Sequence, residues 1–398
     1  MIAPKLRFSE FKDEWQISKL KDVCKINQGL QIAISERFLE NGENRYFYIT
    51  NEFLKEGSKK NYFIENPPKS VICNETDILM TRTGNTGQVV TDVDGAFHNN
   101  FFKIDYSREV INKGFFVEFL RKESTQNLIL KYAGASTIPD LNHSDFYKIE
   151  MIYPNLKEQT KIAEFLSAVD DKISQLSRQL ELLNQYKKGV MQKIFSQEIR
   201  FKNDNGEDFG EWEEKTLLEI ANFRRGSFPQ PYGLPQWLDK DGEPFVQVYD
   251  VADNMSLKPT TKIKISKLAQ EQSVFAPKGT LIITIQGSIG RIAKMQYDAY
   301  VDRTLLIFKD YICEIDVDFF KYSLLLLFNY EKEKADGGVI KTITKESLSK
   351  FVIAVPDIEE QAKIAEFLTA IDERIDHTTA QLTHTKQWKK GLLRQMFV

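Results

Sequence analysis

One long segment occurs twice in this chain of 398 residues, at residues 154–195 and again at residues 356–397. The two copies align without a gap, 202 residues apart, and 19 of their 42 positions are identical. Similarity of that length inside one chain indicates a duplication, which limits the possible folds more than any local motif does. We therefore compare the whole chain as two halves.

Each copy of the segment predicts one long helix. In the first copy, apolar side chains recur at alternating steps of four and three residues from Ile162 to Leu183, which is the a/d pattern of a coiled coil. The second copy keeps this register, with polar residues at Thr378 and Thr385. Forty-two helical residues would span about 60 Å, and a helix with one narrow apolar stripe needs a partner. The other copy is the natural partner, while a coiled coil that only dimerises the protein is the alternative.

The stretches before the two helices also match at their ends, but not in their middles. Residues 31–75 and 228–278 share no convincing similarity. Each stretch contains a β-rich run, a G-x-x-G turn and a second β-branched run, which predicts a strand, a turn and a strand. The matching positions are Trp15 with Trp212, Gly29 with Gly226, and Asp77–Val90 with Thr280–Ala293.

This order predicts an α+β protein made of two similar globular α/β domains and two long helices. The expected boundaries are a first domain at 1–153, a first helix at 154–198, a second domain at 199–355 and a second helix at 356–398. If the helices pack together they must run antiparallel, because each leads away from its own domain. A coiled coil with a pseudo-two-fold axis across its middle is therefore expected.

The composition is that of a soluble globular protein, with 42% hydrophobic and 28% charged residues. No apolar run approaches the ~18 residues that a membrane span needs, and the N-terminus does not read as a signal peptide. The three cysteines lack paired spacing, which favours neither disulfides nor zinc and fits a reducing cytoplasm. A net charge of −3 shows no basic surplus for a nucleic-acid partner.

These features together resemble the specificity subunit of type I restriction–modification systems. The resemblance rests on the pattern P-[ND]-[LI]-x-E-Q-x-K-I-A-E-F-L-x-A-x-D-x-x-I, which begins at both Pro154 and Pro356. It also rests on the glycine- and hydroxyl-rich segment before each helix and on the R-F…E-W…L-x-[DE]-[VI] entry to each globule. It covers essentially the whole chain and recurs twice in the same order.

The resemblance implies two target-recognition domains that bind double-stranded DNA and no catalysis by this chain. It implies assembly with two methyltransferase (modification) subunits and then with restriction subunits, which are ATP-dependent translocases and nucleases. S-adenosylmethionine, ATP and magnesium are accordingly expected on the partner subunits and none of them on this chain. Two unlike domains on a rigid spacer would read two half-sites at a fixed separation.

Motifs for chemistry of the chain's own are weak. An amino-methyltransferase site resembles N-P-P-[FYW], but Asn66-Pro67-Pro68 is followed by Lys69, and no glycine-rich cofactor motif lies near. The phosphate-loop patterns are absent, and the four histidines lack metal-ligand spacing. Two alternatives to a DNA reader remain: a coiled-coil protein-binding scaffold without DNA specificity, and a self-contained methyltransferase, which the missing cofactor motif argues against.

Candidate DNA-binding residues gather around the two G-x-x-G turns and at matched positions in both globules. Base reading needs donor and acceptor side chains on projecting loops. For any single residue, an ordinary surface or turn role is the alternative. The candidates in the first globule are Arg82, Thr83, Asn85, Gln88, His98, Asn99 and Asn100, and in the second Arg224, Arg225, Gln286, Ser288, Arg291 and Arg303. The candidates for phosphate or sugar contacts are Tyr232, Tyr249, Ser136, Thr137, Lys341 and Thr342.

Overall fold

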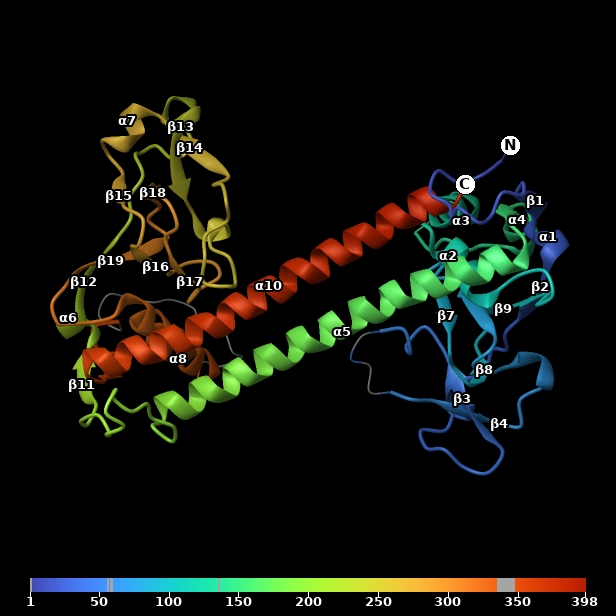
Figure 1. Cartoon of the computed structure of the whole chain (residues 1–398), viewed down its shortest axis with the longest axis horizontal. Coiled ribbons are helices and arrows are strands. Elements are labelled where there is room, and N and C mark those ends of the chain that lie inside the picture. Colours follow the sequence, from blue (N-terminus) through green and yellow to red (C-terminus); the bar gives the residue numbers. More distant parts are fainter. Residues whose placement is uncertain (1, 56, 58–59, 135–136, 335–347) are drawn as a thin grey trace. The chain divides into compact units, whose positions relative to one another are not determined.

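The computed structural model describes residues 2–55, 57, 60–134, 137–334 and 348–398. The chain forms two compact units (Figure 1). Unit 1 consists of Met1–Ser177 and Gln381–Val398, and unit 2 consists of Arg178–Ala380. No helix in the described ranges is long and apolar enough to cross a membrane.

The two predicted long helices are confirmed as α5 (Leu156–Phe195) and α10 (Ile358–Met396). Each helix begins in one unit and ends in the other, so each unit holds the start of one helix and the end of the other. No proline lies within either helix, and two glutamates in the first turn of α10 suit the positive end of the helix dipole.

The described residues of unit 1 form three small sheets. A two-stranded sheet pairs β1 (Gln16–Lys19) with β10 (Glu150–Tyr153). One four-stranded sheet has the order β2-β9-β6-β7, and the other has the order β4-β3-β8-β5. Their strands are β2 (Cys24–Gln28), β3 (Arg45–Ile49), β4 (Phe63–Glu65), β5 (Ile72–Cys73), β6 (Ile78–Thr81), β7 (Val89–Thr91), β8 (Gly95–Phe97) and β9 (Phe101–Tyr106). The helices are α1 (Leu20–Val23), α2 (Lys113–Arg121), α3 (Glu123–Ala133) and α4 (His143–Phe146).

Unit 2 repeats this arrangement. β11 (Glu213–Thr216) pairs with β20 (Val352–Val355), and the four-stranded sheets have the orders β12-β19-β16-β17 and β14-β13-β18-β15. Their strands are β12 (Ala221–Arg225), β13 (Leu238–Val246), β14 (Ile263–Ile265), β15 (Val274–Ala276), β16 (Leu281–Thr284), β17 (Ile292–Lys294), β18 (Ala299–Val301) and β19 (Leu305–Tyr311). Among the residues that the structure describes, the helices before α10 are α6 (Leu217–Ile220), α7 (Lys267–Gln270) and α8 (Val317–Lys334).

The two units share one topology even where their sequences share no similarity. In the middle segments, β3 pairs antiparallel with β4 and parallel with β8, while β13 pairs antiparallel with β14 and parallel with β18. The α+β class and the duplicated architecture are therefore confirmed, and the duplication includes the diverged middles. The coiled coil along the full helices and the four domain boundaries remain predictions.

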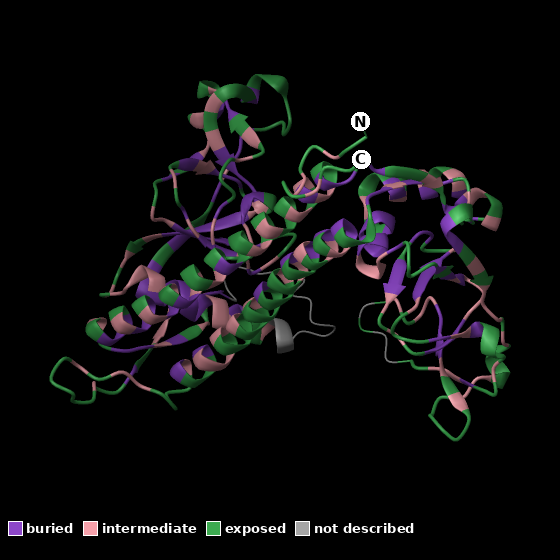
Figure 2. Cartoon of the chain, turned by 45° about the vertical axis from the view of Figure 1, so that its right-hand side comes forward, coloured by how far each residue is buried: buried purple, intermediate pink, exposed green. Residues whose placement is uncertain are grey.

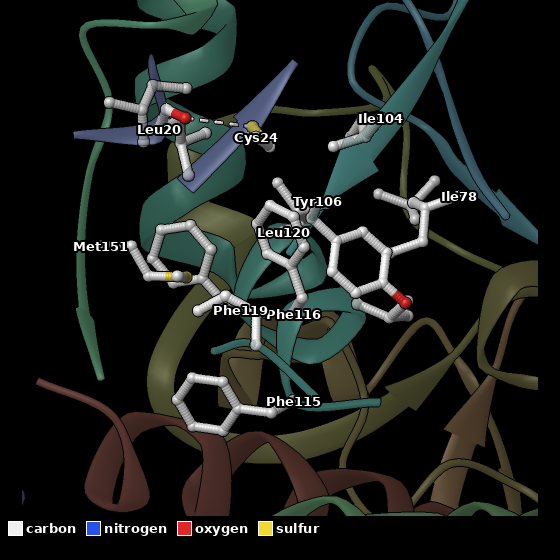
Figure 3. Packing of buried hydrophobic residues seen from close by; sticks show 14 of the residues in the cluster. Leu20, Cys24, Ile78, Ile104, Tyr106, Phe115, Phe116, Phe119, Leu120 and Met151 are labelled. Carbon is white, nitrogen blue, oxygen red and sulfur yellow. Dashed lines mark hydrogen bonds between the residues drawn. The ribbon is translucent and has the colours of Figure 1, made fainter. Parts of the chain in front are cut away.

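The core of unit 1 forms where α2 covers the β2-β9-β6-β7 sheet. Buried residues concentrate in the sheets and in the helix faces against them (Figure 2). Figure 3 shows side chains of α2, including Phe116 and Leu120, close to Ile104 and Tyr106 of β9. Cys24 donates its thiol to the Leu20 carbonyl at 3.1 Å, and burial raises the thiol pKa to about 12, so it packs as an inert apolar side chain.

The end of each long helix completes the core of the unit in which it lies. In unit 1, Phe397 stacks on Phe115 with ring centroids 4.9 Å apart. In unit 2, Phe195 stacks on Phe319 with centroids 5.7 Å apart. Phe195 and Phe397 are matching positions of the repeat, so the same contact is made twice.

Within each unit the two helix segments run antiparallel and are joined by a largely buried lysine. In unit 1, Lys389 near the end of α10 contacts Asp170 at 2.7 Å and Glu118 at 3.0 Å. In unit 2, Lys187 near the end of α5 contacts Asp372 at 2.5 Å. Lys187 and Lys389 are matching positions, as are Asp170 and Asp372, so this ion pair is duplicated as well.

A buried carboxylate anchors the start of each long helix. In α5, Glu158 is fully buried and accepts two hydrogen bonds from Arg7, at 2.7 and 2.8 Å, which raise the pKa of that guanidinium. In α10, Glu360 is fully buried, accepts from Arg200 at 2.7 Å and also accepts from the Trp212 indole at 3.0 Å.

The glutamine that follows each buried carboxylate ties the helix to the globule. Gln159 accepts from the Asn112 amide and donates to the Pro154 carbonyl, at 2.9 and 2.8 Å. Gln361 makes the same two bonds, to Asp316 and Pro356, at 2.9 and 2.8 Å. The repeated E-Q pair of the sequence is therefore the joint between helix and domain.

We expect Glu360→Ala to lower the free energy of unfolding by about 3 kcal/mol, because it leaves the Arg200 guanidinium and the Trp212 N–H without their acceptor. Urea unfolding of the whole chain, followed by tryptophan fluorescence, measures the change. Glu366→Ala on the exposed side of the same helix is the control and should shift stability by less than about 0.5 kcal/mol. Equal effects of the two substitutions would contradict a structural role for Glu360.

Candidate nucleic-acid interface

The G-x-x-G turn of unit 1 is closed by a buried threonine at the end of β6. The Thr81 hydroxyl donates to the Asn85 carbonyl, and its oxygen accepts from the Gln88 amide at 2.9 Å. Gly84 and Gly87 both have positive φ, 88° and 91°, which glycine adopts without strain. The predicted turn is confirmed. In unit 2 the same bonds join Thr284 to Ser288 and Arg291, with Gly287 and Gly290 also at positive φ.

A second loop lies against this turn in both units. In unit 1 it connects β8 to β9, and the Asn100 carbonyl accepts from the Arg82 amide at 2.7 Å. In unit 2 it connects β18 to β19, and the Thr304 carbonyl accepts from the Ile285 amide at 2.9 Å. These bonds make Asn99 and Arg303 equivalent positions.

The chain that leaves β2 or β12 crosses the same loop at a glycine. A Cβ on Gly29 would lie 2.2 Å from the His98 carbonyl oxygen, and one on Gly226 would lie 2.1 Å from the Val301 carbonyl oxygen. Only glycine fits so close an approach of two backbones. In each unit, three loops therefore meet at one end of the β2-β9-β6-β7 or β12-β19-β16-β17 sheet.

In unit 1 this loop surface is internally hydrogen-bonded. Arg82 donates to both Asp140 oxygens, at 3.0 and 2.8 Å, and to Gln28 at 3.0 Å. Gln28 also contacts the His143 ring nitrogen at 2.9 Å and donates to the Asn99 carbonyl at 2.5 Å. The positive charge of Arg82 is therefore neutralised by Asp140, and the same hydrogen bonds fix the loop that carries Asp140.

The pKa values of both histidines near this surface are lowered. Burial lowers the pKa of His143 and of His98, with the nearby Arg82 and Arg37 guanidiniums as second causes. Both imidazoles are therefore neutral at pH 7. The Arg82 hydrogen bonds lower the pKa of the Asp140 carboxyl. The loop surface of unit 1 is polar without a free positive charge at these positions.

In unit 2 the equivalent surface carries arginines that are not neutralised. Arg224, Arg225 and Arg303 are exposed, and none has an ion pair within the described residues. Arg225 occupies the position that Gln28 holds in unit 1, directly before the matched glycine. Arg291 differs, since it pairs with Asp253 at 3.0 Å.

Two exposed tyrosines extend the surface of unit 2. The hydroxyls of Tyr232 and Tyr249 both bond the side-chain amide of Gln247, which is 8% exposed. Burial, the neighbouring Asp250 and other groups raise the pKa of Tyr249 to about 12, so its hydroxyl stays protonated. Lys262 lies 5.1 Å from the centre of the Tyr249 ring.

The structure brings most of the sequence-predicted residues to these loop surfaces. Asn85 and Gln88 are exposed on the turn of unit 1, and Gln286 and Ser288 on that of unit 2. Thr83 bonds Asp140 and so belongs to the internal network. Ser136, Lys341 and Thr342 lie outside the described residues, while Thr137 is exposed close to Asp140 in the sequence.

Three residues of these surfaces carried no signal in the sequence. No motif marks Gln28, Gln31 or Gln247 themselves, and these glutamines join the surface only through the folded loops. The matched glycine was the one available pointer, because Gln28 precedes Gly29 and Gln31 follows it by two residues.

The same loop surface is therefore built twice, with different side chains. Comparison with known proteins identifies the class. The family model "Type I restriction modification DNA specificity domain" matches residues 12–185 and again 210–385, which is most of the chain. The chain therefore belongs to this family and carries its DNA specificity domain twice.

Relatives and solved structures agree with this assignment. The MjaVIII specificity subunit of Methanocaldococcus jannaschii is 25% identical over 96% of this chain and 91% of its own length. The EcoBI specificity subunit of Escherichia coli is 22% identical over 94% and 84%. An S subunit from M. genitalium has a similar fold, with a TM-score of 0.63 at 18% identity, over 100% of this chain and 99% of that one.

Family membership makes this chain a non-catalytic DNA specificity protein of a type I system. It decides against both alternatives, the scaffold without DNA specificity and the self-contained methyltransferase. It does not test which side chains contact DNA.

We expect Arg82→Ala to destabilise unit 1 by about 1 kcal/mol at neutral pH, because a partly exposed bidentate ion pair is lost. The folded-state pKa of Asp140 is lowered, so the pair stabilises the fold above the ordinary carboxyl pKa, and this stabilisation is lost as pH falls through the lowered folded-state pKa. Urea midpoints of wild type and variant from pH 7 to pH 2.5 should converge in acid. A gap that stays constant would show that the ion pair is not its source.

Proposed function

We propose that each unit reads one half of an asymmetric, interrupted site in double-stranded DNA. Residues 1–153 form the first target-recognition domain and residues 199–355 the second. Spacer helices at 154–198 and 356–398 set the separation of the half-sites. The observation that carries this proposal is the duplicated loop surface, which keeps its side-chain-to-backbone bonds at Thr81 and Thr284 and changes its other side chains.

The chemistry of the two surfaces supports different roles in binding. The surface of unit 2 offers Arg224 and Arg225, which have no ion pairs within the described residues and so suit a phosphate backbone. The surface of unit 1 offers amides and hydroxyls, which suit base edges more than phosphates. The remaining sequence-predicted residues, including Asn100, Thr137 and Arg291, are further candidate contacts.

We also propose the partners that the subunit directs. Two methyltransferase subunits dock on the helices and bind S-adenosylmethionine, and restriction subunits that use ATP and magnesium join them in the cytoplasm. The names of the relatives support this, since each is a specificity subunit of a restriction enzyme. One solved relative is described in terms of complex assembly of a type I restriction–modification system.

A methylation map tests the proposed function. DNA from cells that express this chain with the methyltransferase of its own system should carry adenine marks at one interrupted, asymmetric motif. Replacing residues 199–355 by the matching segment of a relative should change one half of that motif and leave the other. Marks that are absent, or that ignore sequence, in the presence of a well-formed complex would refute the proposal.

Salt dependence tests the arginines of unit 2. We expect Arg224→Ala or Arg225→Ala to weaken binding of the assembled complex to all duplexes alike and to reduce the slope of log K against log salt by about 1. Lys309→Ala is the charge-matched control, because Lys309 pairs with Asn222 towards the opposite end of β12 and β19. An unchanged slope in the arginine variants would remove them from the DNA contact.

A further inference from the structure

The two loop surfaces hold different side chains at one structurally equivalent place. Asn99 and Arg303 are equivalent because the residue before each makes the same backbone hydrogen bond. The His98 amide donates to the Ile49 carbonyl at 2.9 Å, and the Asp302 amide donates to the Val246 carbonyl at 3.0 Å. The second residue after the matched glycine is Gln31 in unit 1 and Phe228 in unit 2. These two equivalent positions carry Asn99 and Gln31 in unit 1, and Arg303 and Phe228 in unit 2.

In unit 1 this place presents an amide in a fixed orientation. The Asn99 side-chain NH2 donates to the Gln31 Oε1 atom at 2.9 Å. Gln31 is exposed, and its own NH2 group has no hydrogen-bond partner within the described residues. Its Oε1 retains a second lone pair. Gln31 therefore offers one donor and one acceptor side by side, on a side chain whose rotation Asn99 restricts.

In unit 2 the same place presents a guanidinium held on an aromatic ring. Arg303 lies 5.9 Å from the centre of the Tyr232 ring, within the range of a cation–π contact. Tyr232 is itself fixed, by the bond between its hydroxyl and Gln247 and by the Phe228 ring, whose centroid is 4.9 Å away. Arg303 is exposed and has no ion pair within the described ranges, so its donors are available.

We propose that Gln31 and Arg303 are the base-reading residues of the two domains, for an adenine and a guanine respectively. This rests on the proposed function and names the bases that it reads. In the major groove adenine presents the N7 acceptor beside the N6 donor, which matches the acceptor and donor of a glutamine amide. Guanine presents N7 and O6, both acceptors, which match two donors of a guanidinium.

The other polar residues of these surfaces are less suited to read bases. Arg82 and Gln28 use their donors and acceptors on Asp140, His143 and each other. Reading a base with either would break bonds that hold the loops together. Asn99 and Tyr232 are positioning residues here, because they act on DNA through Gln31 and Arg303.

The test measures base preference position by position. The complex of the whole chain with its methyltransferase subunits is equilibrated with duplex libraries randomised through each half-site, and bound DNA is sequenced. We expect Gln31→Ala to reduce the preference for adenine at one position of one half-site by about 5- to 150-fold, the range of one bidentate contact. Arg303→Ala should do the same for guanine at one position of the other half-site. Asn99→Ala should weaken the preference at the same adenine as Gln31→Ala, and nowhere else.

Matched controls and outcomes separate this inference from the function on which it rests. Gln16→Ala, an exposed glutamine on β1, and Lys309→Ala on β19 should leave both half-sites unchanged. Variants count only if they still copurify with the methyltransferase subunits. Loss of affinity for all sequences alike, or an unchanged motif in both variants, would overturn the base-reading assignment while the proposed function stands. A wild-type complex without any sequence preference would overturn the proposed function itself.

Discussion

The fold depends on a carboxylate that is buried at the start of each long helix. Glu158 and Glu360 are fully buried and would be costly there without Arg7 and Arg200, so the helix can start only where the segment that carries the arginine reaches it. Gln159 then hydrogen-bonds the loop before α2. Each buried carboxylate is stabilised only when its arginine lies beside it in one geometry. This requirement fixes the direction of the helix relative to its globule more firmly than apolar packing alone would. Since each helix ends in the other unit, both units depend on these two joints.

The architecture could be predicted from the sequence because its signals are local or repeated. The a/d spacing from Ile162 to Leu183 predicts α5, and the gapless repeat predicts α10 even where Thr378 interrupts the apolar stripe. The matched topology of the middle segments could not be predicted, because short strands such as β5 and β8 have two or three residues each and make nonlocal pairs. A buried strand position requires only an apolar side chain of suitable size. The sequences of these strands can therefore diverge while the order in which the strands pair stays the same.

The candidate interface was predictable in place but not in detail. The G-x-x-G turns located it, since positive φ at Gly84 and Gly287 favours glycine at those positions. The roles of individual side chains depend on partners far away in the sequence. From the sequence, Arg82 is a candidate to contact DNA bases, but in the structure it is bonded to Asp140, 58 residues further on. Gln31 carried no signal and is oriented by Asn99, 68 residues further on. No local pattern encodes such pairs.

In each loop surface, the groups that shape the backbone are separate from the side chains that we propose read DNA. The bonds that shape the loop surface run from backbone groups, from Thr81 or Thr284, and from the close approach at Gly29 or Gly226. None of them needs the side chains of Gln31, Phe228, Asn99 or Arg303, so these positions can change without loss of the loop geometry. Each domain holds its exposed side chain in place by a different contact. In unit 1 the Asn99 amide bonds the Gln31 amide, and in unit 2 Arg303 lies against the Tyr232 ring. Under the base-reading roles proposed for Gln31 and Arg303, a new half-site requires a new pair of side chains and no new fold.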